Sequence, residues 1–207
     1  NELNRGFIKR MKIGTPFVTS KIAMSLDGRI AMKSGESKWI TSKASRDDVQ
    51  LLRSQNQAIL TGSGTILSDN PMLTVRNKKL DSSPLRVVID SNNLVTDTSL
   101  NIFSSGPDTL IFNQSNSNTL DNGKIDLELA LNKLGELGIN NVLLEAGSGL
   151  NSAMIDAELI DEFIIYIAPV LLGTDAKPMT ELSFEKMSEK ISLNIIELTQ
   201  IANDLKI

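Results

Sequence analysis

Polar residues suited to chemistry gather in three stretches between Phe17 and Arg76, each at the end of an apolar run. They are residues 21–29 (KIAMSLDGR), 35–41 (GESKWIT) and 61–76 (TGSGTILSDNPMLTVR), and a fourth stretch, EAGSG, covers residues 145–149. Glycine lets backbone N–H groups approach a phosphate, and the N-terminus of a following helix favours negative charge. The turns at residues 61–65 and 145–149 therefore indicate a nucleotide or another phosphorylated ligand, with simple tight turns as the alternative.

Lys21 interrupts one apolar run, and Glu145 directly ends another. A lysine inside an apolar strand costs solvation free energy unless it is paired or takes part in chemistry, although it could also reach solvent from an edge strand. Glu145 stands beside the second Gly-rich turn, so it is either paired structurally or functional. Asp27, which precedes Gly28, is more typical of a turn than of a site.

Arg53, Arg76 and Trp39 are further candidates with two interpretations each. Both arginines could be solvated surface charges, although Arg76 ends an apolar segment close to Asp69, which favours a role in the site. Trp39 is the only tryptophan and lies in a polar stretch. It could anchor the core or stack against a planar cofactor.

The composition excludes several classes of protein. The 207 residues carry a net charge of −4 and include no cysteine and no histidine. Thiolate–imidazole zinc sites, cysteine nucleophiles and histidine bases are therefore excluded, and a reducing cytoplasm is compatible with the absence of disulfides. The sequence has no basic nucleic-acid footprint and no apolar run long enough to span a membrane.

The order of apolar runs predicts an α/β fold in one domain. Strands are expected at residues 17–25, 58–61, 85–90, 109–113, 141–145 and 162–168, and helices at 42–56, 65–68, 126–137 and 150–157. This alternation implies a mainly parallel central sheet with helices on both faces. Residues 191–202 and 204–207 predict an antiparallel edge at the C-terminus. Residues 30–41 predict a loop or short hairpin, and residues 1–15 a polar linker.

The combined motifs resemble the reductase domain of the bifunctional riboflavin-biosynthesis deaminase–reductase (RibD) family. They are KxAMSLDGR (21–29), GxSxWIT (35–41), AILTG (58–62), DxPxLTVR (69–76), EAG (145–147) and APxLLG (168–173). The resemblance covers nearly the whole chain. It implies that residues 1–15 are a linker from an upstream deaminase domain and that residues 16–207 are the reductase domain.

The resemblance also implies a dihydrofolate-reductase-like fold, NADPH as cofactor and a cytoplasmic homodimer. The reaction would be reduction of the ribosyl group of 5-amino-6-(5-phosphoribosylamino)uracil to ribityl. NADPH would contact Ala23, Trp39, Thr65, Asp69, Ser91, Gly147, Ser148, Gly149, Leu150, Asn151, Ser152 and Ala153. The substrate would contact Ser37, Arg53, Leu73, Arg76 and Glu145. Lys21 would lie near the reacting ribose, and Lys21 and Glu145 are the catalytic candidates.

Other functions remain open from the sequence. Without histidine and cysteine this chain cannot deaminate by the family's zinc mechanism. A related pyrimidine or pterin reductase of the same fold, or a non-catalytic nucleotide-binding module, would fit many of the same features. Whether Lys21, Glu145 or water balances the charge that develops during hydride transfer is also undecided.

Overall fold

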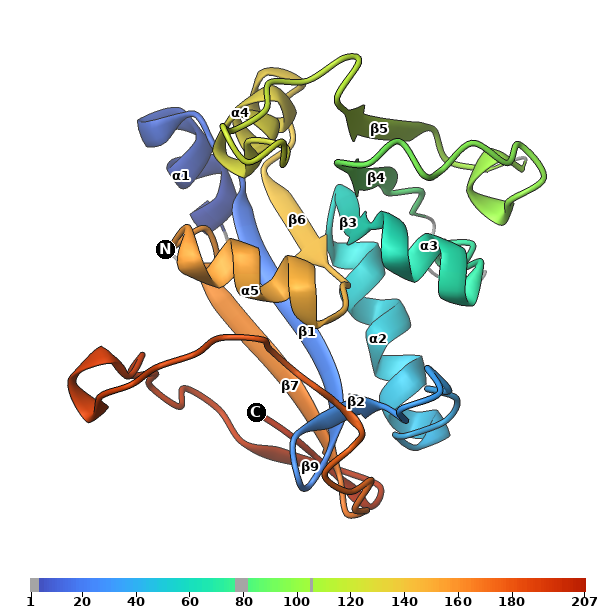
Figure 1. Cartoon of the computed structure of the whole chain (residues 1–207), viewed down its shortest axis with the longest axis vertical. Coiled ribbons are helices and arrows are strands. Elements are labelled where there is room, and N and C mark those ends of the chain that lie inside the picture. Colours follow the sequence, from blue (N-terminus) through green and yellow to red (C-terminus); the bar gives the residue numbers. More distant parts are fainter. Residues whose placement is uncertain (1–3, 77–81, 105) are drawn as a thin grey trace.

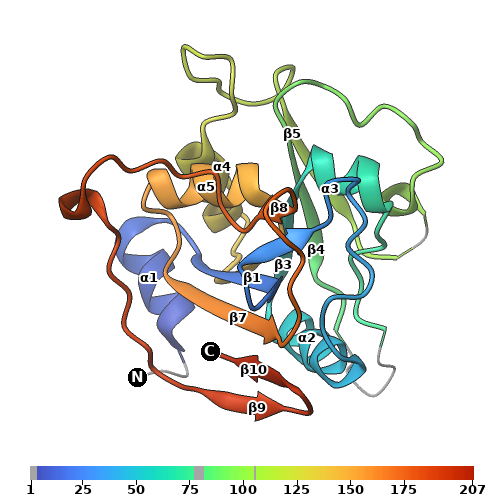
Figure 2. The ribbon, with the colours of Figure 1, turned by 60° about the horizontal axis from the view of Figure 1, so that its bottom comes forward.

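The structure, a computed structural model, describes residues 4–76, 82–104 and 106–207. Within them an eight-stranded sheet has the order β5-β4-β3-β6-β1-β7-β10-β9 (Figure 1). Its strands are β1 (Phe17–Ser25), β3 (Ala58–Gly62), β4 (Leu85–Asp90), β5 (Thr109–Asn113), β6 (Asn141–Leu144), β7 (Glu162–Ala168), β9 (Thr199–Ile201) and β10 (Asp204–Lys206). The first six strands of this order run parallel, and β10 and β9 close the sheet antiparallel. Figure 2 shows β7, β10 and β9 side by side at this edge.

Helices cover both faces of the sheet, as the alternation of strands and helices predicts. They are α1 (Arg5–Ile13), α2 (Lys43–Gln55), α3 (Ser63–Asp69), α4 (Leu127–Glu136) and α5 (Ser148–Asp156), with single 3-10 turns η2 (Asn101–Phe103) and η3 (Met187–Glu189). Strand β3 shows how the faces divide. Leu60 packs in a core with residues of α4 and α5, whereas Ile59 packs in another with Ile66 of α3.

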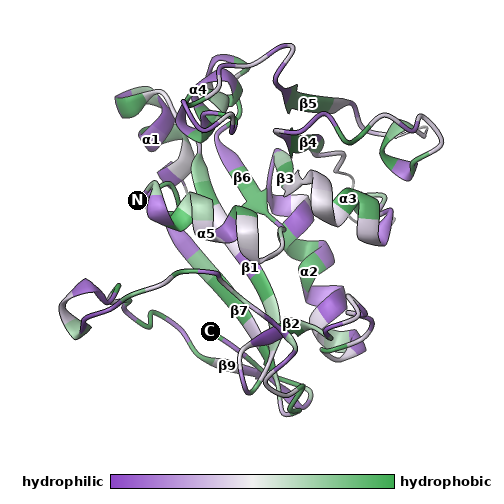
Figure 3. Cartoon of the chain, in the orientation of Figure 1, coloured by the Kyte–Doolittle hydropathy of each residue, from purple (hydrophilic) through white to green (hydrophobic). Residues whose placement is uncertain are grey.

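Apolar side chains fill the space between sheet and helices. Val18, Val142 and Leu144 are fully buried in the core below α4 and α5. On the opposite face Leu52 of α2 packs against Leu143 and Tyr166. Figure 3 shows the hydrophobic colour along central strands such as β1 and β6. No helix among the described residues is long and apolar enough to cross a membrane.

The N-terminal segment expected as a linker contains a docked helix. In α1, Arg5 pairs with Glu162 at 2.6 Å, and Lys9 pairs with Asp161 at 2.5 Å. The end of α1 lies against α4. The carbonyl oxygen of Gly14 approaches Gly135 so closely that a side chain at Gly135 would clash with it. The polar composition of this segment suggested a linker, but tertiary contacts stabilise it as a helix.

Three other expectations about local structure need correction. Strand β9 covers only Thr199–Ile201, so residues 191–198 are not paired in the sheet. Helix α5 begins at Ser148, two residues before the predicted start. Strand β2 (Arg29–Ala31) pairs with β8 (Lys177–Pro178), a partner far along the chain, instead of closing a hairpin within residues 30–41. A tight turn at Gly35 does form, with the amide of Gly35 bonded to the carbonyl of Met32.

Candidate active site

A cleft of about 1040 Å³ opens at the carboxyl ends of the parallel strands. Its walls include Lys21 and Ala23 of β1, Thr65 after β3, Ser91 after β4 and Glu145 after β6. Ligands of open α/β sheets bind at this edge. The polar stretches of the sequence therefore meet at one place, although they come from separate parts of the chain.

Nearly all predicted site residues line this cleft. Those with the predicted cofactor role are Ala23, Trp39, Thr65, Asp69, Ser91, Gly147, Ser148, Gly149, Leu150 and Ala153, and those with the predicted substrate or catalytic role are Lys21, Ser37, Arg53, Leu73, Arg76 and Glu145. The exceptions are Asn151 and Ser152, which are buried on the inner side of α5. Asn151 accepts a hydrogen bond from the Ser20 hydroxyl and donates to the carbonyl of Ala146, so it fixes the Gly-rich turn from behind.

Lys21, Glu145 and Arg53 form a largely buried ionic cluster in the wall of the cleft. The Arg53 guanidinium donates from Nε to Oε1 of Glu145 at 2.6 Å and from Nη2 to Oε2 at 3.0 Å. The Lys21 ammonium lies 3.3 Å from Oε2 of the same carboxylate. The lysine that interrupts β1 is therefore paired, and the helix face of Arg53 points to the site.

Glu145 stays ionised despite its burial. Burial alone would raise the pKa of its carboxyl, but the charges of Arg53 and Lys21 and their hydrogen bonds outweigh burial and lower the pKa to about 2. A carboxylate with this pKa carries no proton near neutral pH. Glu145 can therefore accept hydrogen bonds and stabilise positive charge, but it cannot act as a general acid.

The turn into α5 offers unfilled backbone donors to the cleft. Its N-cap residue, Gly147, has no side chain to accept from the first-turn amides, and a Cβ built there would meet nothing within 4 Å. The Glu181 carboxylate lies beside this turn and accepts from the Ser148 hydroxyl at 2.5 Å. Open space and free N–H groups at a helix N-terminus suit a phosphate.

Trp39 lies at the surface of the cleft, so its interpretation as a core anchor is wrong. Its side chain is 64% exposed, and the Arg46 guanidinium lies 4.3 Å from the centre of its ring. Arg46 is held by a hydrogen bond to the carbonyl of Thr41. The Arg46 guanidinium therefore packs on one face of the indole, and the exposed ring remains accessible to a planar ligand.

Arg76 and Arg53 differ in how free their guanidinium groups are. Arg53 is committed to Glu145 and also donates to the carbonyl of Thr74 at 3.0 Å. Arg76 is exposed, and its backbone N–H donates to Oε1 of Gln50 at 2.8 Å. Gln50 thus fixes the backbone of Arg76, and none of the ion pairs between described residues includes the arginine side chain.

Asp27 shapes the neighbouring loop and does not line the cleft, which confirms its interpretation as a turn residue. The hydrogen bond from the Ser25 hydroxyl lowers the pKa of Asp27 most, and together with bonds from the amides of Gly173 and Leu172 it lowers the pKa to about 2. Gly28 has a φ of +74°, the left-handed conformation that glycine tolerates.

Several cleft residues escaped the sequence reasoning. They are Arg46, Gln50, Lys124, Lys177 and Glu181. Arg46 and Gln50 share the helix face of Arg53, at spacings of seven and three residues, so helical periodicity could have assigned them with it. Glu181 and Lys177 lie in a segment with no periodic pattern, and nothing local to them indicates a site.

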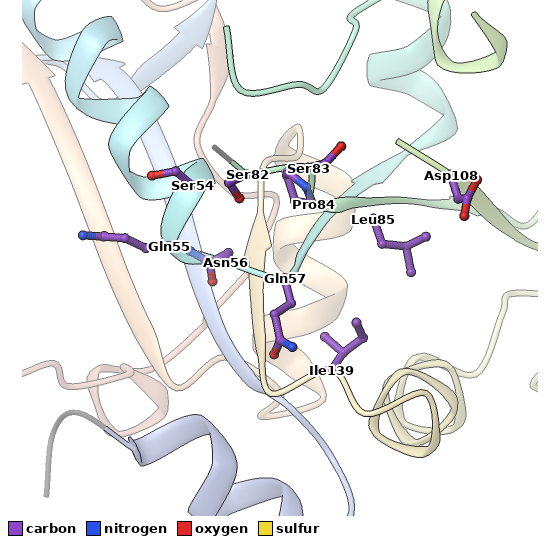
Figure 4. A pocket seen from close by; sticks show the side chains of 10 residues that line it. All are labelled: Ser54, Gln55, Asn56, Gln57, Ser82, Ser83, Pro84, Leu85, Asp108 and Ile139. Atoms are coloured by element: carbon purple, nitrogen blue, oxygen red, sulfur yellow. The ribbon is translucent and has the colours of Figure 1, made fainter. Parts of the chain in front are cut away.

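A smaller hollow of about 420 Å³ lies near the amino ends of β3 and β4. Figure 4 shows its lining of Ser54, Gln55, Asn56, Gln57, Ser82, Ser83, Pro84, Leu85, Asp108 and Ile139. None of these residues is a cation, and the hollow holds none of the predicted site residues. The described residues also contain no group of three Asp or Glu side chains that could hold a metal ion.

Comparison with known proteins assigns the chain to a family. The family model described as the RibD C-terminal domain matches residues 16–207. The chain belongs to the RibD C-terminal domain family. It is 41% identical to the riboflavin biosynthesis protein RibD of Escherichia coli over 99% of this chain and 62% of that protein. It is 40% identical over 85% of its length to the 5-amino-6-(5-phosphoribosylamino)uracil reductase of Buchnera aphidicola, of which it covers 97%.

Solved structures confirm the predicted fold. Acinetobacter baumannii RibD superposes with a TM-score of 0.87 at 35% identity, over 99% of this chain and 60% of that one. Dihydrofolate reductase from Enterococcus faecalis shares the fold alone, with a TM-score of 0.50 at 14% identity over 92% of this chain and 94% of that one. The chain thus spans about three fifths of the length of the RibD proteins that it matches.

Proposed function

We propose that this chain reduces the ribosyl group of 5-amino-6-(5-phosphoribosylamino)uracil with NADPH. One observation carries the proposal: the cleft combines open space at Gly147, the N-cap of α5, with the cluster of Lys21, Glu145 and Arg53. The name of the Buchnera reductase, which this chain matches over most of its length, supports the same substrate. A related pyrimidine or pterin reductase would use the same cleft, so the substrate needs a direct test.

The residues of the cleft fit a dinucleotide. The amides at the start of α5 would hold its pyrophosphate, and Trp39 would stack against a planar ring. The rest of the dinucleotide would lie along Ala23, Thr65, Asp69 and Ser91. When bound, the nicotinamide would supply the hydride for C1′ of the opened, imine-like ribose.

Glu145 and Lys21 would act on the substrate from the side of β1 and β6. Ionised Glu145 would accept hydrogen bonds from the hydroxyls of the open ribose chain and favour positive charge at the imine. Because Glu145 holds no proton near neutral pH, Lys21 or water would supply any proton that the reaction requires.

The decisive experiment is an absorbance assay of NADPH oxidation. The purified chain should consume the phosphoribosylaminouracil and leave both dihydrofolate and the undeaminated pyrimidinone unreduced. Oxidation of NADPH with either of these other compounds, but not with the uracil, would replace the proposed substrate. No oxidation with any of them, despite NADPH binding, would favour a non-catalytic nucleotide-binding module.

NADPH binding should change the fluorescence of Trp39. Trp39 is the only tryptophan, and its indole is exposed in the cleft. A cofactor ring stacked on the indole would therefore quench its emission. Titration of the chain with NADPH should give a saturable change, and Trp39→Phe should abolish the signal while calorimetry still detects binding. Calorimetric binding to the wild-type chain without any change in fluorescence would place the cofactor away from Trp39.

We also propose a homodimer, supported by an exposed apolar segment at residues 191–198. Ile191, Leu193, Ile195, Ile196 and Leu198 are all exposed there, with Ile195 at 70% and Ile196 at 85%. Contiguous apolar surface of this kind marks interaction sites. A second copy of the chain could cover it, because unpaired extended backbone beside a sheet edge is suited to self-association.

Light scattering after size-exclusion chromatography tests the dimer. The wild-type chain should elute with twice the chain mass, and Ile196→Asp should shift it to the monomer. Leu137→Asp is the matched control, because Leu137 is also exposed but lies at the end of α4. A monomeric wild type, or equal effects of the two variants, would contradict this interface.

A further inference from the structure

Lys124 is a cleft residue that neither the sequence motifs nor the proposed reaction uses. It lies in the loop between β5 and α4 and lines the cleft together with Ser91, Asn92 and Ile125. Its side chain is exposed, and none of the ion pairs between described residues includes it. A free cation inside a cleft proposed for a phosphorylated cofactor requires an explanation.

Hydrogen bonds hold the loop that carries Lys124 in place. The carbonyl of Lys124 accepts from the amide of Leu120 at 2.8 Å, and its own amide donates to Oδ1 of Asn122 at 2.9 Å. The next residue, Ile125, is buried and donates from its amide to the Ser91 hydroxyl oxygen at 3.0 Å. The backbone of Lys124 is thereby fixed beside the end of β4, and the Ser91 hydroxyl donates to no acceptor among the described residues.

The strand order fixes which end of a dinucleotide would reach Lys124. The reacting ribose would lie by Lys21 and Glu145, at β1 and β6, so the nicotinamide belongs at that end. The pyrophosphate opening follows β6. From β1 the order runs β6, β3, β4, and three steps of about 4.8 Å place the end of β4 about 14 Å away. An extended dinucleotide that reacts at β1 would therefore present its adenosine half at β4.

The other cations of the cleft have different partners or positions. Lys21 and Arg53 are bound to Glu145, and Arg46 stacks on Trp39. Lys177 lies on β8 beside Gly35, within 4 Å of a Cβ built there. Lys38 precedes Trp39, and the backbone of Arg76 is bonded to Gln50 of α2. Among the cations that line the cleft, Lys124 is the one next to Ile125, whose amide is bonded to Ser91 at the end of β4.

We infer that Lys124, with the Ser91 hydroxyl, binds the 2′-phosphate on the adenosine ribose and so selects NADPH over NADH. The inference rests on the proposed function and names the residue that would make the choice between the two cofactors. A lysine ammonium can donate to phosphate oxygens as a point charge, and a neighbouring hydroxyl adds a second donor. NADH lacks the 2′-phosphate, so Lys124 would have nothing to bind in it.

Calorimetric titrations of NADPH and NADH into the wild-type chain and Lys124→Gln test this role. The variant should raise the Kd for NADPH about tenfold, near the lower end of a hydrogen bond to a charged group, and leave the Kd for NADH unchanged. Lys124→Arg should retain the preference for NADPH. Lys133→Gln is the matched control, because Lys133 is exposed on α4 outside the cleft and should change neither affinity.

Each other result would overturn the inference in a distinct way. Equal losses for NADPH and NADH would move Lys124 to a part shared by the two cofactors. Unchanged affinities would make Lys124 a solvated surface charge, and a wild-type chain that binds the two equally would have no selectivity to assign. If the wild-type chain bound neither cofactor, the proposed function itself would be contradicted. This result differs from the other three, which contradict only the role of Lys124.

Discussion

Glu145→Gln should lower kcat by about a hundredfold or more, in the range that positioned acid–base and electrostatic groups contribute to catalysis. The amide keeps the shape of the side chain but removes the charge that holds Lys21 and Arg53. Two cations would then face each other in a poorly solvated wall, and the site would lose its acceptor for the open ribose. The Kd for NADPH should change little, because we propose that Glu145 contacts the substrate and not the cofactor.

A purely structural role for Glu145 would give a different pattern. Breaking a buried ion pair costs about 3–5 kcal/mol of unfolding free energy, so the variant should also unfold at lower denaturant concentration. Activity must therefore be measured well below the unfolding transition, with folding checked by circular dichroism. A variant that loses stability but keeps kcat would show that Glu145 only holds the fold together.

The pH dependence of stability offers a second test of the cluster. The pKa of Glu145 is lowered from 4.5 to about 2 in the folded chain, so the unfolded state binds the proton more readily. Its contribution to stability is then present above pH 4.5 and is lost as the pH falls towards 2. The difference in unfolding free energy between wild type and Glu145→Gln should shrink over this range. A difference that does not depend on pH would contradict the depressed pKa.

The sequence predicted most elements because their signals are local. The short continuous apolar run of β3, whose first four residues are all buried, and the apolar stripe of α4 can be recognised from the sequence alone. Helix α1 had no such signal, since its position depends on ion pairs of Arg5 and Lys9 with residues more than 150 positions away. Residues 191–198 have apolar β-formers but no partner strand in the sheet, and residue composition does not specify a partner.

The candidate site was predictable in its members but not in its contacts. The family resemblance named Lys21, Arg53 and Glu145 separately, yet their contact with one another depends on β6 lying between β1 and β3. Strand order is a property of the whole sheet, so a local pattern cannot supply it. For the same reason the sequence could not show that Glu145 pairs with Arg53. It therefore could not show that this pairing engages the Arg53 guanidinium. Glu181 was missed because it reaches the start of α5 from a distant loop.

Arg76→Ala should cost about ten- to a hundredfold in kcat/KM, because a hydrogen bond to a charged group contributes about 1.5–3 kcal/mol. The family resemblance places Arg76 and Arg53 among the substrate contacts, and the 5′-phosphate is the part of the substrate that two arginines would suit. In the structure Arg53 is engaged with Glu145, so we now expect Arg76 to carry most of the phosphate interaction. Its exposed guanidinium at the mouth of the cleft suits the planar, multi-donor recognition of phosphate.

The dephosphorylated substrate decides whether Arg76 reads the phosphate. That compound has already lost the partner group, so wild type and Arg76→Ala should reduce it with equal kcat/KM. Arg76→Lys should recover part of the activity on the phosphorylated substrate, because it restores the charge but not the planar fork. The Kd for NADPH should be the same in all three proteins. If Arg76→Ala costs as much on the dephosphorylated substrate as on the phosphorylated one, Arg76 acts on another part of the substrate or on the fold of its segment.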